Sequence, residues 1–261
     1  MRAIRQFIDA PLQVGGSVAL TEAAAQHLVR VLRLGPGAAV VLFNGDGHDY
    51  AARLLAAGKR GGEAEVLERI AARAESPLRI TLAQALARGE KMDHVLQKAV
   101  ELGVHAIVPV VTERTEVRLD AERADRRMQH WRGVLVGACE QCGRARPPHL
   151  SAPRALAEFA SAQAAAAGPG GVANDSVAPM AAARCLYLDP GATDSVGTLA
   201  LTAEASVVLV IGPEGGLSER DVAILRAARF DGLRLGPRIL RTETAGLAAI
   251  AAINALYGDW R

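Results

Sequence analysis

Ile211-Gly-Pro-Glu-Gly-Gly-Leu217 and Leu235-Gly-Pro-Arg-Ile-Leu-Arg-Thr-Glu-Thr-Ala245 are the most informative segments of this chain. Each follows a short apolar run typical of a buried strand, and each leads into a helical pattern. The Gly-Pro dipeptides predict a tight turn at the end of both strands. We therefore expect two strand ends whose turns face one ligand pocket.

The region upstream of these turns sets the fold class. A strand pattern at residues 79–86 precedes a helical pattern at 90–102, which Gly103 ends, and a buried strand at 106–111 follows. This order forms a βαβ unit and predicts a parallel sheet. The pattern continues with strands at 184–188, 206–211 and 232–235 and helices at 120–142, 219–228 and 244–256. We expect an α/β domain over residues 77–261.

The beginning of the chain has a different pattern. Short apolar or alternating runs predict strands at 3–7, 17–20, 39–44, 48–55 and 62–70, with one helix at 21–32. Asp46-Gly47 lies between two of these runs and predicts a hairpin. We expect a small β-barrel over residues 1–72, separated from the second domain by a polar stretch that ends at Pro77. Residues 160–183, rich in Ala and Gly, predict a flexible insertion.

Composition gives broad limits. The chain has 261 residues, of which 50% are hydrophobic, and a net charge of +2, so the overall charge does not identify a nucleic-acid binder. Three cysteines, no secretion signal and no apolar stretch long enough to span a membrane predict a cytoplasmic protein without membrane segments. Cys139 and Cys142 lack further ligands at zinc-site spacing, so we expect packed thiols and no metal.

The glycine turns lack the usual phosphate-binding patterns. No lysine and hydroxyl follow a glycine loop as in a P-loop, and residues 212–216 do not match the spaced glycines of dinucleotide-binding proteins. Two plain strand-to-helix turns are the alternative. Gly215 and Gly216 allow a ligand to approach the backbone, and Ser218 with Asp221 forms a capping box for the next helix. Backbone amides and carbonyls at this edge favour an adenine-containing ligand over a phosphate.

The second turn carries unusual charge. Arg238 and Arg241 come just before an apolar helix, where the positive end of the helix dipole disfavours cations. A capped helix start is the alternative explanation, with Thr242 or Thr244 as cap and Glu243 in the first turn. That alternative leaves the two arginines unexplained, so we consider a functional role for them.

Basic residues gather locally. Arginines outnumber acidic residues between Arg123 and Arg146, which is typical of a solvated helix face and also of an RNA-binding surface. With 3% aromatic residues, stacking on many bases is not expected. The RNA-binding candidates are Arg30, Arg33, Arg88, Lys91, Arg144 and Arg146.

Five motifs stand out together: Arg88-Gly-Glu-Lys-Met92, Glu101-Leu-Gly103, Glu140-Gln-Cys-Gly-Arg144, the segment from Ile211 to Ser218 and the segment from Leu235 to Thr244. In this combination the chain resembles the ribosomal RNA small subunit methyltransferase E family. The resemblance runs nearly end to end and includes residues 27–37, whereas the insertion departs from the family. It implies a PUA-like N-terminal barrel and a SPOUT-type α/β domain with a deep trefoil knot, acting as a homodimer.

The resemblance also implies the reaction. This family uses S-adenosylmethionine to make N3-methyluridine in bacterial 16S ribosomal RNA, in the decoding region and on a structured ribosomal particle. By the resemblance, the two turns are knot loops that hold the cofactor. The cofactor-binding candidates are Ile211, Gly212, Pro213, Glu214, Gly215, Gly216, Leu217, Leu235, Gly236, Pro237, Ile239, Leu240, Arg241 and Thr242.

Methyl transfer to uracil N3 needs removal of the imide proton and stabilisation of charge on O2 and O4. We expect Arg241, with Arg238, to stabilise that charge, and Glu243 or Glu214 to accept the proton. Two other classes remain as alternatives. A non-catalytic RNA-binding assembly factor would not need the paired turns, and a nucleotide-dependent oxidoreductase would need spaced glycines and an acidic ribose ligand.

Overall fold

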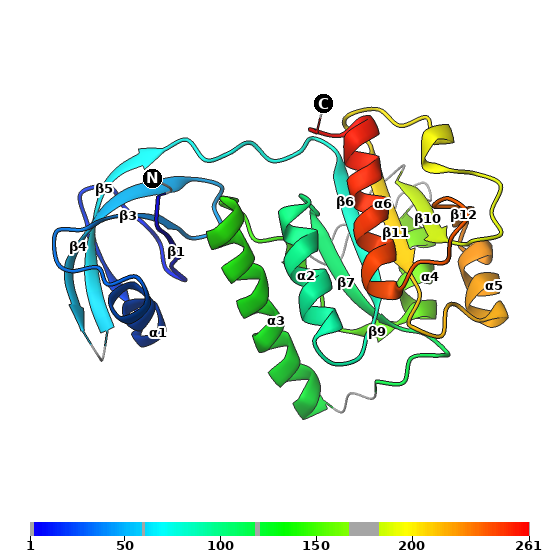
Figure 1. Cartoon of the computed structure of the whole chain (residues 1–261), viewed down its shortest axis with the longest axis horizontal. Helices are drawn as coiled ribbons and strands as arrows, with labels where there is room; N and C mark the ends of the chain where they lie inside the picture. Colours follow the sequence, from blue (N-terminus) through cyan, green and yellow to red (C-terminus); the bar gives the residue numbers. More distant parts are fainter. Residues whose placement is uncertain (1–2, 59–60, 118–120, 167–182, 261) are drawn as a thin grey trace. The chain divides into compact units, whose positions relative to one another are not determined.

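A computed structural model describes residues 3–58, 61–117, 121–166 and 183–260 (Figure 1). Contacts divide the chain into two units, one of Met1–Glu75 with Val136–Pro147 and one of Ser76–Leu135 with Pro148–Arg261. The predicted insertion lies mostly outside the described residues, because only its ends, up to residue 166 and from 183, belong to them. The domain limits 1–72 and 77–261 stay a prediction.

The first unit is built on a five-stranded sheet. Its strands are β1 (Arg5–Phe7), β2 (Ser17–Leu20), β3 (Ala39–Phe43), β4 (Asp49–Gly58) and β5 (Gly61–Ile70), in the order β1-β3-β4-β5-β2. All neighbours are antiparallel except β1 and β3. The predicted hairpin joins β3 and β4, and Gly47 there has a φ of +95°, a conformation that favours glycine. Alternate residues such as Leu42 and Leu54 are fully buried in the core of the unit.

One helical segment packs against this sheet. It starts as α1 (Glu22–Gln26), where the Thr21 hydroxyl accepts a hydrogen bond from the amide of Ala24, and continues as the π-helical turn η1 (His27–Val31). Leu28 at the start of η1 is fully buried in the core. Arg33 follows with a φ of 54°, a left-handed conformation that is strained for a bulky residue. The sequence predicted a single helix and missed the π-turn.

The end of helix α3 (Ala121–Cys142) belongs to the first unit. The Glu140 carboxylate accepts hydrogen bonds from the Gln6 side chain at 2.7 Å and from the backbone amide of Phe7 at 2.9 Å. It therefore provides acceptors for two donors of the edge strand β1. Just beyond the helix, Arg144 forms two hydrogen bonds to Glu75, at 2.6 and 3.2 Å. The first unit is therefore assembled from segments distant in the sequence.

The second unit contains the parallel sheet expected from the βαβ pattern. Its main strands are β6 (Arg79–Ala85), β7 (Ala106–Val111), β10 (Arg184–Leu188), β11 (Ser206–Ile211) and β12 (Asp231–Leu233). The order is β12-β10-β11-β6-β7-β8, with β8 (His149–Leu150) at the edge and β9 (Arg154–Ala155) also paired with β7. Every pairing is parallel. The α/β class predicted from the sequence is confirmed.

Helices cover both faces of this sheet (Figure 1). On one side α2 (Lys91–Glu101) packs against α6 (Thr242–Tyr257), and Gly246 of α6 lies so close to Leu82 and Ile211 that a methyl group there would meet Ile211 at 3.2 Å. On the other side α4 (Leu156–Ala166) and α5 (Glu219–Ala227) enclose a core that includes Phe159 and Phe230. Successive side chains of the buried strands point to opposite faces of the sheet, so each strand packs against helices on both sides.

The remaining elements follow local signals. Ser218 caps α5, and the capping box with Asp221 is confirmed, with the hydroxyl 3.0 Å from the Asp221 amide. Gly103 follows α2 with a φ of +82°, as expected of a helix stop. A short 3₁₀ turn, η2 (Val196–Thr198), follows β10. In the described part of the chain, no helix combines the length and apolar character needed to cross a bilayer.

Candidate active site

A cavity of about 690 Å³ lies at the carboxyl ends of β10, β11 and β12. In open parallel sheets this edge is where ligands bind, because the loops that leave the strands converge there. The predicted cofactor residues other than Pro237 all line the cavity, and so do Arg238 and Glu243. The two turns therefore face one pocket, as the sequence predicted. The ligand roles of the individual residues stay predictions.

The first turn follows β11 and is shaped by glycine. A Cβ atom on Gly212 would lie 2.9 Å from the amide nitrogen of Leu217, so no larger residue fits there without moving the backbone. The Gly216 amide donates to the Pro213 carbonyl at 2.9 Å, which closes the turn, and Gly216 has a φ of +70°. The turn thus folds back on itself and presents backbone groups to the cavity.

The second turn joins β12 to α6. Gly236 adopts a φ of +70°, and the exposed Ile239 lies just after it. Helix α6 begins at Thr242, and its N-cap is Arg241, whose side chain makes no capping hydrogen bond. The alternative explanation, a helix capped by Thr242 or Thr244, is therefore wrong, because Arg241 is the N-cap and the Thr242 hydroxyl bonds to Gly212 and Gln84. Glu243 lies in the first turn of the helix, as predicted.

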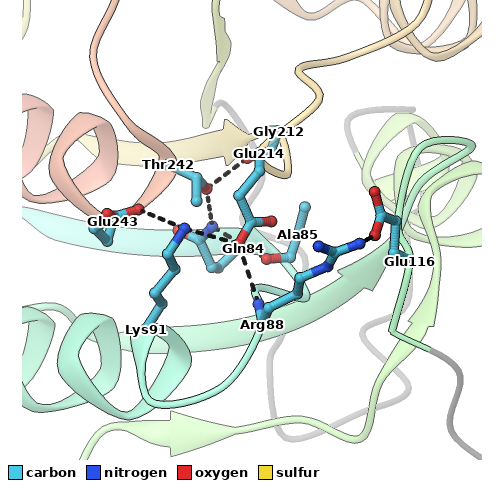
Figure 2. Close-up of polar contacts among 9 residues, drawn as sticks. All are labelled: Gln84, Ala85, Arg88, Lys91, Glu116, Gly212, Glu214, Thr242 and Glu243. Atoms are coloured by element: carbon cyan, nitrogen blue, oxygen red, sulfur yellow. Dashed lines mark hydrogen bonds and ion pairs between the residues drawn. The ribbon is translucent and has the colours of Figure 1, made fainter.

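Thr242 connects three elements of the pocket (Figure 2). Its hydroxyl donates to the Gly212 carbonyl at 2.7 Å and accepts from the side-chain amide of Gln84 at 3.0 Å. Gln84 is fully buried near the end of β6, next to Ile211 of β11. Its amide also donates to the Ala85 carbonyl at 3.1 Å. This chain of hydrogen bonds fixes the first turn against the start of α6.

Lys91 lies between two carboxylates of the cavity wall (Figure 2). Its ammonium nitrogen is 3.1 Å from Oε1 of Glu214 in the first turn and 3.6 Å from Oε2 of Glu243 on α6. The Arg88 amide also donates to Oε1 of Glu214, at 3.2 Å, while the Arg88 side chain forms an ion pair with Glu116. Helix α2 thus contacts both turns through one side chain.

The two glutamates differ electrostatically. Burial raises the pKa of Glu214, but its own amide, the Arg88 amide and Lys91 outweigh that effect, so the pKa lies below its usual value. Glu214 is therefore ionised and well bonded at neutral pH. Oε2 of Glu243 is buried and has no hydrogen-bond donor among the described residues, with only the longer ion pair to Lys91.

The two arginines of the second turn are exposed and line the cavity. Neither Arg238 nor Arg241 has an ion-pair or hydrogen-bond partner for its side chain within the described ranges. Since Arg241 is also the N-cap of α6, its charge gains nothing from the helix dipole. Both guanidinium groups are free to meet a negatively charged ligand.

The RNA-binding candidates fall into three groups. Arg88 and Lys91 lie beside the pocket and are paired with acidic residues, as described above. Arg30 and Arg33 are exposed at the end of the helical segment of the first unit. Arg144 is paired with Glu75 and its side chain is only 13% exposed, whereas Arg146 donates to the Asp46 carbonyl at 2.8 Å. Their contacts with RNA stay predictions.

The cysteines are free thiols in this structure. Cys139 is buried, and burial raises its pKa to about 12. Cys142 and Cys185 are partly buried. Across the described residues, no group of three or more His, Cys, Asp and Glu side chains is placed to hold a metal ion.

Comparisons with known proteins give the family. A model described as an RNA methyltransferase domain matches residues 74–254, and one described as an RNA methyltransferase PUA domain matches residues 20–67. A Synechocystis protein named ribosomal RNA small subunit methyltransferase E is 32% identical, over 96% of this chain and 77% of its own length. The chain belongs to the ribosomal RNA small subunit methyltransferase E family. The family predicted from the sequence is thereby confirmed.

Solved structures of related proteins support the same family. A ribosomal RNA small subunit methyltransferase E from Neisseria gonorrhoeae, bound to S-adenosyl methionine, is 37% identical with a TM-score of 0.88, and each chain is covered completely. A putative methyltransferase from Legionella pneumophila in complex with the same cofactor is 35% identical, with a TM-score of 0.88 and coverage of 99% and 100%. These relatives confirm, at the level of the family, the predicted cofactor, and the matched models confirm an RNA methyltransferase domain with an N-terminal PUA-like unit.

Sequence patterns did not predict several residues that line the cavity, and they suggested a different role for Lys91. Tyr187, Leu188, Asp189 and Pro190, at the end of β10, line the cavity. The rule that parallel strands end at one edge would have found them, because the predicted strand at 184–188 stops there. Lys91 was assigned to RNA from its charge alone. No pattern in the sequence indicates that its partners are two glutamates more than 100 residues away.

Proposed function

We propose that this protein transfers a methyl group from S-adenosylmethionine to N3 of a uridine in the decoding region of bacterial 16S ribosomal RNA. The observation that carries the proposal is the single cavity that both glycine turns line, with Arg238, Arg241 and Glu243 on its wall. The proposal extends to a substrate in the form of the assembled small subunit. It includes a homodimer in the cytoplasm and a trefoil knot formed by the two turns.

The pocket suits the cofactor. A cavity of about 690 Å³ is within the usual size of small-molecule sites. Residues 211–217 line the cavity as a tight glycine turn, and the backbone amides and carbonyls of such a turn can recognise the edge of an adenine. Residues 211–217 and 235–242 would hold the cofactor. When bound, it supplies an electrophilic methyl group on a sulfonium.

Glu243 is the better placed proton acceptor. Uracil N3 carries a proton that has to leave for the nitrogen to act as a nucleophile. Glu214 already accepts from Arg88 and Lys91, and these donors lower its pKa, so it is a poor base. Oε2 of Glu243 has no hydrogen-bond donor among the described residues, and it lies 3.6 Å from the Lys91 nitrogen, compared with 3.1 Å for Glu214. We therefore assign the proton to Glu243, the less strongly bonded of the two carboxylates, directly or through a water molecule.

Arg241 and Arg238 complement the charge that develops on the base. Removing the N3 proton spreads negative charge onto O2 and O4 of uracil, and fixed positive groups in a site shielded from water stabilise it. Both guanidinium groups line the cavity and have no acidic partner in the described part of the chain. The target base has to leave its stack to reach them.

The first unit would supply most of the RNA contact. Arg30 and Arg33 are exposed, and no acidic side chain within the described ranges pairs with them. Phosphate contacts of this kind position the substrate without reading its sequence. Arg88, next to the pocket mouth, would contact the RNA near the target base.

The experiment is methyl transfer to small subunits that lack the modification, with Arg241→Ala and Glu243→Gln compared with the wild type. Loss of a group that stabilises charge in the transition state lowers kcat by about 100-fold or more, and loss of a general base lowers it by about 100-fold or more. The rates are compared at saturating S-adenosylmethionine, with cofactor affinity measured by calorimetry, because Arg241 and Glu243 also line the cofactor cavity. Full activity of Arg241→Ala would contradict its assigned role, and methylation at another atom would contradict the proposed reaction.

A further inference from the structure

Lys91 occupies an unfavourable place for a cation. It is the first residue of α2, where the helix dipole disfavours positive charge, and the N-cap Glu90 makes no side-chain hydrogen bond to the helix end. A lysine at this position in an exposed helix would gain by pointing into solvent. Instead its side chain is 35% exposed and points into the wall of the cavity.

Two carboxylates from different elements share this one ammonium group. Glu214 lies in the glycine turn after β11, and Glu243 lies at the start of α6, where the second glycine turn ends. Both glutamates line the cavity. Both carboxylate oxygens lie within 3.6 Å of the Lys91 nitrogen. Without the cation, the two carboxylates would be left close together with no positive charge between them, and like charges repel.

We propose that Lys91 is a positioning residue, which ties the two turns of the cofactor pocket together by bridging Glu214 and Glu243. This inference rests on the proposed function only in that the pocket binds S-adenosylmethionine. In the bridged arrangement the turn at residues 212–217 and the start of α6 are held at a fixed separation before the cofactor arrives. Such preorganisation increases affinity, because the ordering of the loops does not have to accompany binding.

A bridging role for Lys91 differs from the direct ligand contacts that its positive charge alone suggests. A lysine at the pocket mouth could instead contact an RNA phosphate or the carboxylate of the cofactor. An RNA contact would leave cofactor affinity unchanged when no RNA is present. A direct contact with the cofactor would operate whether or not the two glutamates carry charge. The bridge is distinct from both, since it acts through the glutamates.

Calorimetric titration of the full-length protein with S-adenosylmethionine, without RNA, separates these roles. Lys91→Met should raise the Kd about five- to tenfold, the effect of losing about 1 kcal/mol or slightly more from a partly buried ion pair. Lys91→Arg keeps the charge and should restore most of the affinity. Lys98→Met is the matched control, because Lys98 lies on the same helix and pairs with Glu101 at 2.8 Å, outside the residues that line the cavity.

The decisive comparison uses a Glu214→Gln/Glu243→Gln background, in which the bridge has no anionic partners. Adding Lys91→Met there should change the Kd by less than about twofold, since coupled residues are not additive. An undiminished effect in that background would show direct contact with the cofactor and overturn the proposal. No effect of Lys91→Met in the wild-type background would overturn it in favour of RNA. Circular dichroism checks folding, and Lys91→Arg provides a second folded variant.

The Lys91 bridge and the proposed methylation reaction can fail independently of each other. If the wild-type protein binds S-adenosylmethionine but does not methylate uridine N3, the proposed reaction fails while the Kd series still tests the bridge. If the wild type methylates N3 and Lys91→Met binds the cofactor as well as Lys98→Met does, the reaction stands and the bridge fails.

Discussion

Thr242 provides a stringent test of how the pocket is assembled, because its hydroxyl joins β6 and the first turn to α6. The change is Thr242→Val, which keeps the shape of the side chain and removes only the hydroxyl. Thr242 is 5% exposed and Gln84 is fully buried, so neither lost partner can turn to water without moving backbone. The substitution therefore leaves the Gly212 carbonyl and one Gln84 N–H without their bonds.

The magnitude follows from these two groups. An orphaned buried acceptor costs about 1–3 kcal/mol and a lost hydrogen bond about 1 kcal/mol, which gives about 2–4 kcal/mol of stability in total. Gln84 keeps its bond to the Ala85 carbonyl at 3.1 Å, which limits the loss on that side. For a domain of this size the melting temperature should fall by roughly 6–12 °C. The freed turn should also raise the Kd for S-adenosylmethionine by about tenfold, or about 1.4 kcal/mol.

Thermal unfolding by circular dichroism and cofactor titration by calorimetry measure the two effects. Thr244→Val is the matched control, since Thr244 is exposed in the first turn of the same helix and its hydroxyl has no partner among the described residues. It should change neither quantity appreciably. If Thr242→Val behaved like this control in both measurements, the hydrogen-bond chain would not hold the turn, and this explanation of the pocket would be refuted.

Two further predictions concern the first unit. Arg33→Gly should weaken binding to small-subunit RNA in filter assays and lower the slope of log affinity against log salt by about one unit. Its melting temperature should stay unchanged or rise, because the left-handed φ of 54° at Arg33 costs an L-residue about 1–2 kcal/mol. Unchanged RNA affinity would contradict the RNA-binding role of Arg33. Burial raises the pKa of Cys139 to about 12, so this thiol should resist iodoacetamide at pH 8 in the folded protein. It should react after unfolding in guanidinium, and mass spectrometry measures the labelling. Rapid labelling of the folded protein would contradict the buried position of Cys139.

Much of the fold could be predicted from local pattern. The strands at residues 106–111, 184–188 and 206–211 have the predicted limits, because buried strands in a parallel sheet are continuous apolar runs. β8 and β9 escaped prediction, since strands of two residues have no period to detect. The π-turn after α1 escaped for a related reason, because the apolar spacing of residues 21–32 fits an ordinary helix.

The pocket could be predicted only in part. Glycine, proline and charge at residues 211–217 and 235–243 indicated two turns at one site, and both line the cavity. The partners of those residues could not be predicted, because they depend on tertiary contacts over long sequence separations. The sequence offered a local role for the Thr242 hydroxyl, as one of two possible caps of its own helix, but the hydroxyl bonds instead to Gly212 and Gln84. Lys91 is a similar case, in which charge was evident and its partners were not.

We propose that the protein methylates uridine N3 in 16S ribosomal RNA. Nucleoside mass spectrometry of 16S RNA from the source organism, with and without the gene for this protein, tests this reaction in the cell. N3-methyluridine should disappear from the deletion strain, return with the wild-type protein and remain absent with Arg241→Ala. N3-methyluridine at the wild-type level in the deletion strain, or loss of a different methylated nucleoside, would contradict the proposed reaction.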